Sequence, residues 1–214
     1  MDKRLGGIFI LLGAGALPFI VVEYVLISQN FPGLTASTSE LHSYYQQYYK
    51  GLARGWRFEM IAMALLGAGA LVQMKDINRS GWALTAIGVA LVLPMYAAMI
   101  GGYGTIVSQE QFDLAGYRTI VGFATSVFDG GNFVFSLGLA VALFQEAKLT
   151  RTGMPGWLLI CGSLAQFAAS VGFAFRHFGG ELPLPVMGIP ALLGFVVVAV
   201  FGAYVTFGDR PARA

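Results

Sequence analysis

Long apolar stretches, separated by short polar segments, occupy most of this chain of 214 residues. Each stretch is near or above the ~20 residues that cross a hydrocarbon layer of ~30 Å at 1.5 Å per residue. Runs such as 195–200 are apolar on every side, whereas the strands of a membrane barrel alternate apolar and polar residues. We therefore predict six membrane-spanning helices, at Leu5–Ile27, Phe58–Met74, Trp82–Tyr103, Ile120–Phe144, Trp157–Phe175 and Leu184–Phe207.

The composition agrees with this pattern. Hydrophobic residues make up 57% of the chain and charged residues 11%, and the mean hydropathy is +0.70. Six spans leave only short loops and one longer segment, so we expect residues 1–214 to form a single all-α domain, an integral membrane bundle of six transmembrane helices. The lipid bilayer is then one of the partners that we expect for this domain.

Lys and Arg residues are biased toward one side of the predicted bundle. With the N-terminus inside, eight of the 13 lie in inner loops, and an excess of Lys and Arg is typical of cytoplasmic loops. We therefore expect both termini in the cytoplasm and a retained first span, because no small-residue cleavage site follows it. The net charge of +2 reflects this bias and does not indicate nucleic-acid binding.

The longest loop joins the first two spans. Ser37 and Glu40 have the spacing of a helix capping box, so we expect a tyrosine-rich helical segment at about 38–51 that runs toward the second span. Its tyrosines are typical of a membrane–water interface. Ser108 and Gln111 repeat the capping spacing before the fourth span.

Two spans share a heptapeptide, Leu-Leu-Gly-Ala-Gly-Ala-Leu, at Leu11–Leu17 and Leu65–Leu71. An ancestral repeat would explain it. We favour the simpler interpretation, that small residues recur because they let helix backbones approach closely in lipid.

Ionisable residues inside a membrane are costly unless paired, so they are the first candidates for function. Glu23 and Glu59 lie near the outer ends of the first two spans. Asp129 is 11 residues beyond Arg118, about 16 Å at 1.5 Å per residue, which predicts a position near the midplane. Because Arg118, Arg176 and His177 also lie on the outer side, we predict a charged cluster in the outer half of the bundle.

Polar residues form one stripe on each of the fourth and fifth spans, because their spacings of three, four and seven residues return to the same helical face. They predict either a water-filled cavity or hydrogen-bonded packing between helices. For the Ser and Thr side chains both interpretations stay open. For Asp129 we favour a functional role, because a deep carboxylate is too costly for routine packing. The stripes are Thr125, Asp129, Asn132 and Ser136, and Ser163, Gln166, Ser170 and His177.

The residue inventory does not specify a reaction. His42 and His177 are the only histidines and Cys161 the only cysteine, too few for a typical catalytic zinc site, although a haem between the two histidines stays open. The serine-hydrolase motif Gly-x-Ser-x-Gly is absent, and so are nucleotide-binding glycine loops. We therefore predict no catalytic residue, metal or cofactor.

Several short motifs resemble a known family. They are Lys3–Gly7, the Arg57-x-Glu59 start of the second span, the glycine-rich fourth span, and the inner loop Lys148–Trp157. Over nearly its whole length the chain resembles the bacterial membrane proteins of the domain of unknown function 4386 type. The resemblance implies a six-helix bundle in the bacterial inner membrane and no activity. The tyrosine-rich segment and the position of Asp129 depart from the family, so no functional residue is carried over.

Two hypotheses follow from the sequence. In the first, the protein binds or transports a small or lipidic ligand through an outward-facing polar cavity. Its site would comprise Asp129, Asn132, Gln166, Glu23, Glu59, Arg118, Arg176 and His177. In the second, it is a non-catalytic accessory or scaffold subunit that uses its small-residue faces and the tyrosines 44–49 to hold a membrane-protein partner. Homo-oligomerisation stays open in both.

Overall fold

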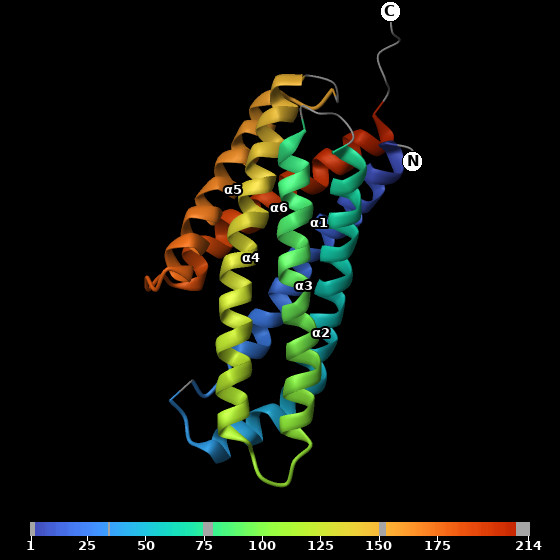
Figure 1. Ribbon diagram of the computed structural model, residues 1–214. Helices are drawn as coiled ribbons and strands as arrows, with labels where there is room; N and C mark the ends of the chain where they lie inside the picture. The colour runs from blue at the N-terminus through green and yellow to red at the C-terminus, as the bar shows by residue number, and fades with distance from the viewer. Residues whose placement is uncertain (1–2, 34, 75–78, 150–152, 209–214) are drawn as a thin grey trace, which may run out of the picture.

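The structure is a computed structural model that describes residues 3–33, 35–74, 79–149 and 153–208. Within these ranges the chain is all-α and has no strand (Figure 1). All six helices are long and apolar enough to cross a membrane. They are α1 (Lys3–Ser28), α2 (Thr38–Gln73), α3 (Ser80–Val107), α4 (Leu114–Leu149), α5 (Gly156–His177) and α6 (Leu184–Phe207).

The helices form one closed ring in chain order. Each packs against the next helix in the sequence, and α6 returns to pack against α1. A Cβ atom on Gly202 would lie 2.6 Å from the amide nitrogen of Leu11 and 2.8 Å from the carbonyl oxygen of Gly7. The backbones of α6 and α1 therefore touch directly where the ring closes. We call the end where α1 begins and α6 finishes the terminal end, and the opposite end the far end (Figure 1).

The shared heptapeptide lies where α1 and α2 meet. A Cβ on Gly13 would lie 2.6 Å from the carbonyl oxygen of Ala62, and one on Gly69 would lie 2.9 Å from that of Gly6. Real Cβ atoms do not come this close, so both positions need glycine for the backbones to approach. The small residues therefore have a packing role here, as the simpler interpretation predicts.

The tightest backbone contact joins α3 and α4. A side chain on Gly88 would overlap the backbone of Phe135, and one on Gly138 would overlap that of Thr85. Each glycine thus fits against the main chain of the opposite helix. This pairing holds α3 and α4 together along most of their length.

The helices differ in length, and this shapes the far end. α2 and α4 each contain 36 residues, whereas α5 contains 22. The ring of His177, at the end of α5, lies beside Gly130 of α4. The part of α4 from Leu114 to Gly130, roughly 24 Å at 1.5 Å per residue, extends beyond α5. α2, α3 and α4 therefore form a far lobe without α5 and α6, comprising residues 29–33, 35–57 and 103–120 (Figure 1).

The far lobe has an aromatic core. Tyr103 stacks between Tyr45, with ring centroids 5.0 Å apart, and Trp56, at 5.5 Å. The hydroxyls of Tyr45 and Tyr117 are 3.4 Å apart. Tyr44 and Tyr45 are each 7% exposed. Both side chains therefore pack inside the protein rather than on its surface, and the interfacial position expected for the tyrosines stays a prediction.

Helix starts agree with the sequence at one of two places. α2 begins at Thr38 with the expected capping box, in which the Glu40 amide donates to the Ser37 hydroxyl and Glu40 accepts from the Ser37 amide. α4 begins at Leu114, and the carboxylate of Asp113 accepts the Gly116 amide at 2.9 Å. The cap predicted at Ser108 is wrong, because Asp113 supplies the acceptor.

Candidate functional site

A cavity of about 610 Å³ lies inside the ring, at the level where α5 ends, and all six helices line it. Most of its wall is apolar or aromatic. The polar side chains on the wall are Glu59 of α2, Thr125 of α4 and Arg176 of α5. The volume and the mixed wall are typical of small-molecule sites, where a few polar groups orient a ligand among apolar ones.

Arg176 is held from behind by Asp129. Its guanidinium Nη2 lies 3.5 Å from Asp129 Oδ2. Asp129 is only 3% exposed and does not line the cavity. Asp129 Oδ1 and Arg176 Nη1 are also buried and have no hydrogen-bond partner among the described residues. Asp129 thus holds the guanidinium of Arg176 at the cavity wall. One polar atom of each side chain can still form a hydrogen bond.

Glu59 supplies the opposite charge. It is half-buried on α2 and faces the hydroxyl of Tyr96 on α3, a side chain that is 1% exposed. A carboxylate and a guanidinium, from α2 and α5, therefore share one mostly apolar cavity. Interactions between charges are stronger in such surroundings than in water, because little solvent screens them.

Two predicted site residues lie elsewhere. Glu23 pairs with Arg54 at 2.6 Å on the surface, with side chains 32% and 64% exposed. Arg118 is exposed on the far-lobe part of α4 and does not line the cavity. The predicted charged cluster thus divides into a surface pair, an isolated arginine, and the group around Arg176.

Asn132 and Gln166 are also absent from the cavity wall. The Asn132 amide donates to the carbonyl of Phe128 in its own helix at 2.8 Å. The Gln166 amide donates to the carbonyl of Ala191 in α6 at 3.1 Å. Gln166 thus joins α5 to α6, whereas the Asn132 amide bonds within α4.

The serines of the fifth-span stripe hold α5 against α4. Ser163 donates to the carbonyl of Ala140 at 2.7 Å, and Ser170 donates to that of Phe133 at 3.1 Å. Of the two interpretations left open for the hydroxyls, packing between helices describes these two serines. Thr125 is instead on the cavity wall.

The structure revises the depth of Asp129. Sequence reasoning counted from Arg118, as though α4 entered the membrane there. Asp129 instead lies beside the end of α5, and Lys148 follows it by 19 residues, roughly 28 Å along the helix. Asp129 is therefore at the end of the six-helix layer and not at its middle.

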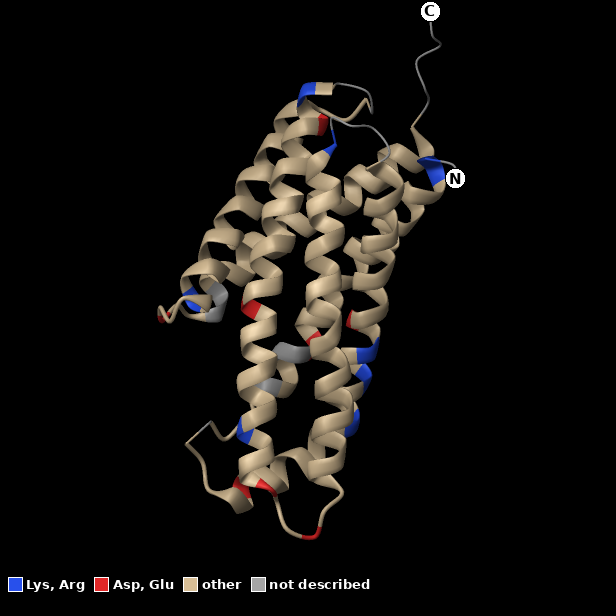
Figure 2. Ribbon diagram, viewed as in Figure 1, with Lys and Arg blue, Asp and Glu red and all other residues tan. Residues whose placement is uncertain are grey.

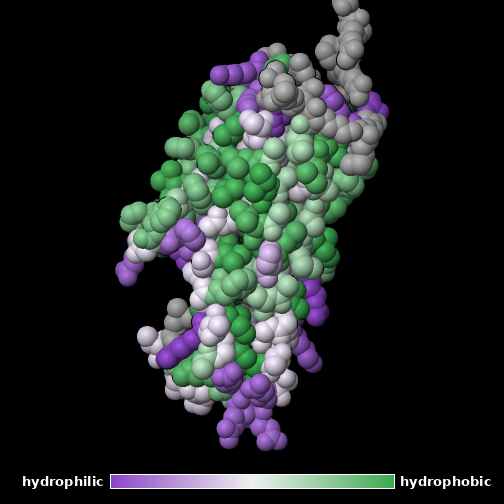
Figure 3. Space-filling model, in the orientation of Figure 1, coloured by the Kyte–Doolittle hydropathy of each residue, from purple (hydrophilic) through white to green (hydrophobic). Residues whose placement is uncertain are grey.

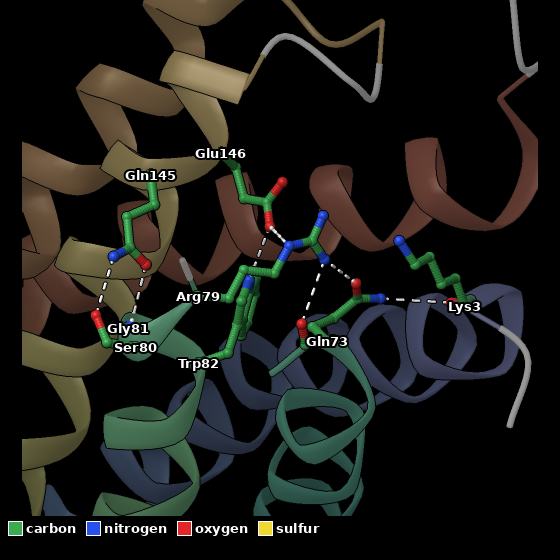
Figure 4. A network of polar contacts seen from close by, with 8 residues as sticks. All are labelled: Lys3, Gln73, Arg79, Ser80, Gly81, Trp82, Gln145 and Glu146. Atoms are coloured by element: carbon green, nitrogen blue, oxygen red, sulfur yellow. Dashed lines mark hydrogen bonds and ion pairs between the residues drawn. The ribbon is translucent and has the colours of Figure 1, made fainter. Parts of the chain in front are cut away.

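The terminal end contains a second polar cluster, which Figure 4 shows and which we call the terminal-end network. Arg79 Nε lies 3.4 Å from Glu146 Oε1, and the two side chains are 5% and 0% exposed. Trp82 Nε1 donates to the same Glu146 oxygen at 3.0 Å. Arg79 Nη1 donates to Gln73 Oε1 at 2.8 Å, and Gln73 Nε2 donates to the Lys3 carbonyl at 3.4 Å.

Sequence reasoning missed this network. Arg79 is one of the eight Lys and Arg residues expected in inner loops, and no role was expected for Gln73 or Glu146. The signal was their position: both lie within the last turn of a long helix, and Arg79 immediately precedes the next one. Polar residues at three helix ends on the same side of the ring are placed to meet.

The two histidines have different surroundings. His42, in the far lobe, contacts Gln46 and packs on Phe112, whereas His177 lies beside Gly130 and Phe178. No group of three or more His, Cys, Asp or Glu that could hold a metal ion occurs in the described part of the chain.

Comparison of the chain with protein-family models, with curated proteins and with solved structures gives no match.

Proposed function

We propose that this is a multi-pass membrane protein that binds or transports a small or lipidic ligand in the central cavity. The observation that carries the proposal is the cavity itself: about 610 Å³, lined by all six helices, with Glu59 and Arg176 on a mainly apolar wall. A close-packed bundle does not require such a space or two opposite charges facing it.

The distribution of charge supports a membrane position between Lys3 and Lys148 at the terminal end and Asp129 and Arg176 at the level where α5 ends. Lys3 to Glu23 is 20 residues, about 30 Å, which matches the hydrocarbon thickness. Figure 2 shows few charged residues between these two levels, and Figure 3 shows a mainly hydrophobic surface there. The far lobe would then project from the membrane.

Orientation follows from the loop charges. The terminal end carries the excess of Lys and Arg, so we propose that it lies in the cytoplasm. We propose the bacterial inner membrane as the location, following the family resemblance of the sequence. The cavity is then at the outer boundary of the membrane. Arg176, with its side chain 20% exposed, is reached from that side.

The roles differ from those expected from sequence. Arg176 is the cationic anchor, Glu59 is its counterpart across the cavity, and Asp129 positions Arg176 without touching the ligand. Replacing Asp129 with Asn should weaken ligand binding about tenfold or more, because the guanidinium is no longer fixed at the cavity wall by a charged contact.

Native mass spectrometry of the protein, extracted in mild detergent from its own membranes, tests the proposal. We expect a reproducible small-molecule or lipid adduct that is lost in Arg176→Gln and retained in Arg118→Gln, a matched loss of charge outside the cavity. A bare subunit, or an adduct equally present in both variants, would contradict cavity binding.

The alternative is an accessory subunit in a larger membrane complex. The bonding of Ser163, Ser170 and Gln166 to backbone carbonyls favours it, because these polar side chains serve packing. The tyrosine segment supports it less, since Tyr44 and Tyr45 are buried in the far lobe. Co-elution with another membrane protein, with no bound small molecule, would favour this role.

A further inference from the structure

The cavity wall changes character along the axis of the ring. α2 runs away from the far end, so Trp56 lies farther out than Glu59; α5 runs toward it, so Phe173 lies deeper than Arg176. On α3, Tyr103 is eight residues beyond Met95, about 12 Å farther out. The wall is therefore aromatic at its outer end, charged in the middle and apolar at its inner end.

The charged level carries both signs. A purely anionic headgroup would pair with Arg176 but face Glu59, and a purely cationic one would do the reverse. A zwitterion meets an opposite charge at each residue, in addition to the contacts of Arg176 with Asp129 and of Glu59 with Tyr96. Guanidinium groups bind phosphate by charge-assisted hydrogen bonds, and a carboxylate near aromatic rings such as Trp56 and Tyr103 suits an ammonium group.

The volume of the cavity matches a ligand with one chain. If each heavy atom occupies roughly 30 Å³, the share of one water molecule in the liquid, the cavity of about 610 Å³ holds on the order of 20 atoms. This is enough for a headgroup and one short alkyl chain, and a second chain would have to lie outside the cavity. The apolar inner end, with Met95, Phe173 and Leu192, is where the chain would lie.

The ring is open to the side at this level. α5 and α6 separate α4 from α1, but both are absent beyond the α5–α6 turn, residues 178–183. Val21 of α1 and Ala124 of α4 line the cavity, and the residues next to them in the sequence, Val22 and Phe123, are 58% and 46% exposed. Figure 3 shows an indentation between this turn and the far lobe.

We propose that the cavity binds a zwitterionic single-chain amphiphile, a phosphate–ammonium headgroup on one alkyl chain, which enters sideways from the outer leaflet between α1 and α4. The phosphate lies on Arg176, the ammonium near Glu59, and the chain points toward the terminal end. This inference rests on the proposed function and names its ligand class.

Tryptophan quenching tests the class of ligand directly. The full chain carrying Trp157→Phe, which removes the lipid-facing tryptophan that is 67% exposed, is placed in lipid nanodiscs. Single-chain probes brominated on the alkyl chain are added, with phosphocholine, phosphate, trimethylammonium or maltoside headgroups. Saturable quenching that disappears in Trp56→Phe reports occupancy of the cavity.

We expect the phosphocholine probe to bind about tenfold more tightly than the other three, the effect of one further charge-assisted contact. In Arg176→Gln the phosphocholine probe should bind no more tightly than the trimethylammonium probe. In Glu59→Gln it should bind no more tightly than the phosphate probe. Arg118→Gln and Glu40→Gln, which remove charges in the far lobe, should leave all four affinities unchanged.

The outcomes separate the inference from the proposal beneath it. Equal binding of all four probes would overturn the assignment of a zwitterionic ligand, but it would agree with ligand binding in the cavity. Competition by free phosphocholine at the affinity of the chain probe would also overturn it, because the ligand would then be a soluble zwitterion. No saturable Trp56 quenching by any probe would contradict both.

Discussion

Arg79 and Glu146 form an ion pair that is almost completely buried at the terminal end, with their nearest side-chain atoms 3.4 Å apart. The pair joins the segment before α3 to the last turn of α4, and Gln73 extends the contact to α2 and the start of α1. One arginine thus connects four of the six helices on the side opposite the cavity.

Removing one member of this pair should destabilise the protein strongly. In Glu146→Gln the buried guanidinium of Arg79 loses the charge of its Glu146 partner, and we expect the free energy of unfolding to fall by about 3–5 kcal/mol. Replacing both, as Arg79→Met with Glu146→Leu, should cost less than either single change, because no lone charge is buried. Chemical unfolding in detergent measures the free energy of unfolding of the double variant and of each single variant.

The surface pair of Glu23 and Arg54 is the control for this experiment. Both side chains are substantially exposed, so Glu23→Gln should change the free energy of unfolding by about 1 kcal/mol or less. Similar losses for Glu23→Gln and Glu146→Gln would show that the buried pair at the terminal end contributes no more to stability than the surface pair.

Glycine positions on α3 and α4 should differ sharply in their tolerance of alanine. Gly88→Ala places a methyl group against the backbone of Phe135, and we expect a loss of about 1–3 kcal/mol or more from overpacking. Gly122, on the same helix as Phe135, has open space at its Cβ. Gly122→Ala should therefore be neutral or stabilising by up to about 1 kcal/mol.

The same unfolding measurement distinguishes the two glycines. If Gly88→Ala were as stable as Gly122→Ala, α3 and α4 would have to lie farther apart in the membrane than in this structure.

The aromatic core of the far lobe should respond to lost volume more than to a lost hydroxyl. Tyr45→Ala removes a ring that packs on Tyr103 and Tyr117, and we expect a loss of about 3–5 kcal/mol. Tyr45→Phe removes only the 3.4 Å contact with the Tyr117 hydroxyl, so about 1 kcal/mol is expected. Limited proteolysis of residues 29–37 reports loosening of the lobe. Equal cleavage of both variants would argue against a packed core.

Cysteine labelling tests the orientation proposed for the protein. In a Cys161→Ser background, Gln109→Cys lies in the exposed α3–α4 connection of the far lobe and Lys148→Cys at the terminal end. A membrane-impermeant maleimide applied to spheroplasts should label Gln109→Cys alone, and lysis should expose Lys148→Cys. The reverse pattern would place the far lobe in the cytoplasm.

Local sequence signals specified the helices, but contacts between distant segments decided the site. Six apolar stretches predicted six helices, and the Ser37–Glu40 spacing predicted the start of α2, because both depend on residues close together in the chain. The interior position of Tyr45 could not be predicted, since it depends on Tyr103 and Trp56 arriving from elsewhere. The sequence pointed to Arg176 and Glu59 by their charge alone.

Position along a helix is where the assembled bundle differs most from the expectation based on sequence. Arg118 and Asp129 were placed relative to a membrane boundary assumed at the nearest charge. The short α5, which ends at His177, brings Arg176 beside Asp129 and sets the level of the site. Helix length relative to neighbours is a property of the assembled bundle, and no single stretch of sequence contains it.

The contact of Gly202 with Gly7 and Leu11 has a consequence for biogenesis. A ribosome delivers α1 first and α6 last, yet these two helices are partners. The face of α1 that receives α6 therefore stays uncovered while the four intervening helices are synthesised. Until α6 is complete, the quality-control factors of the cell would encounter a bundle in which α1 lacks one of its partners.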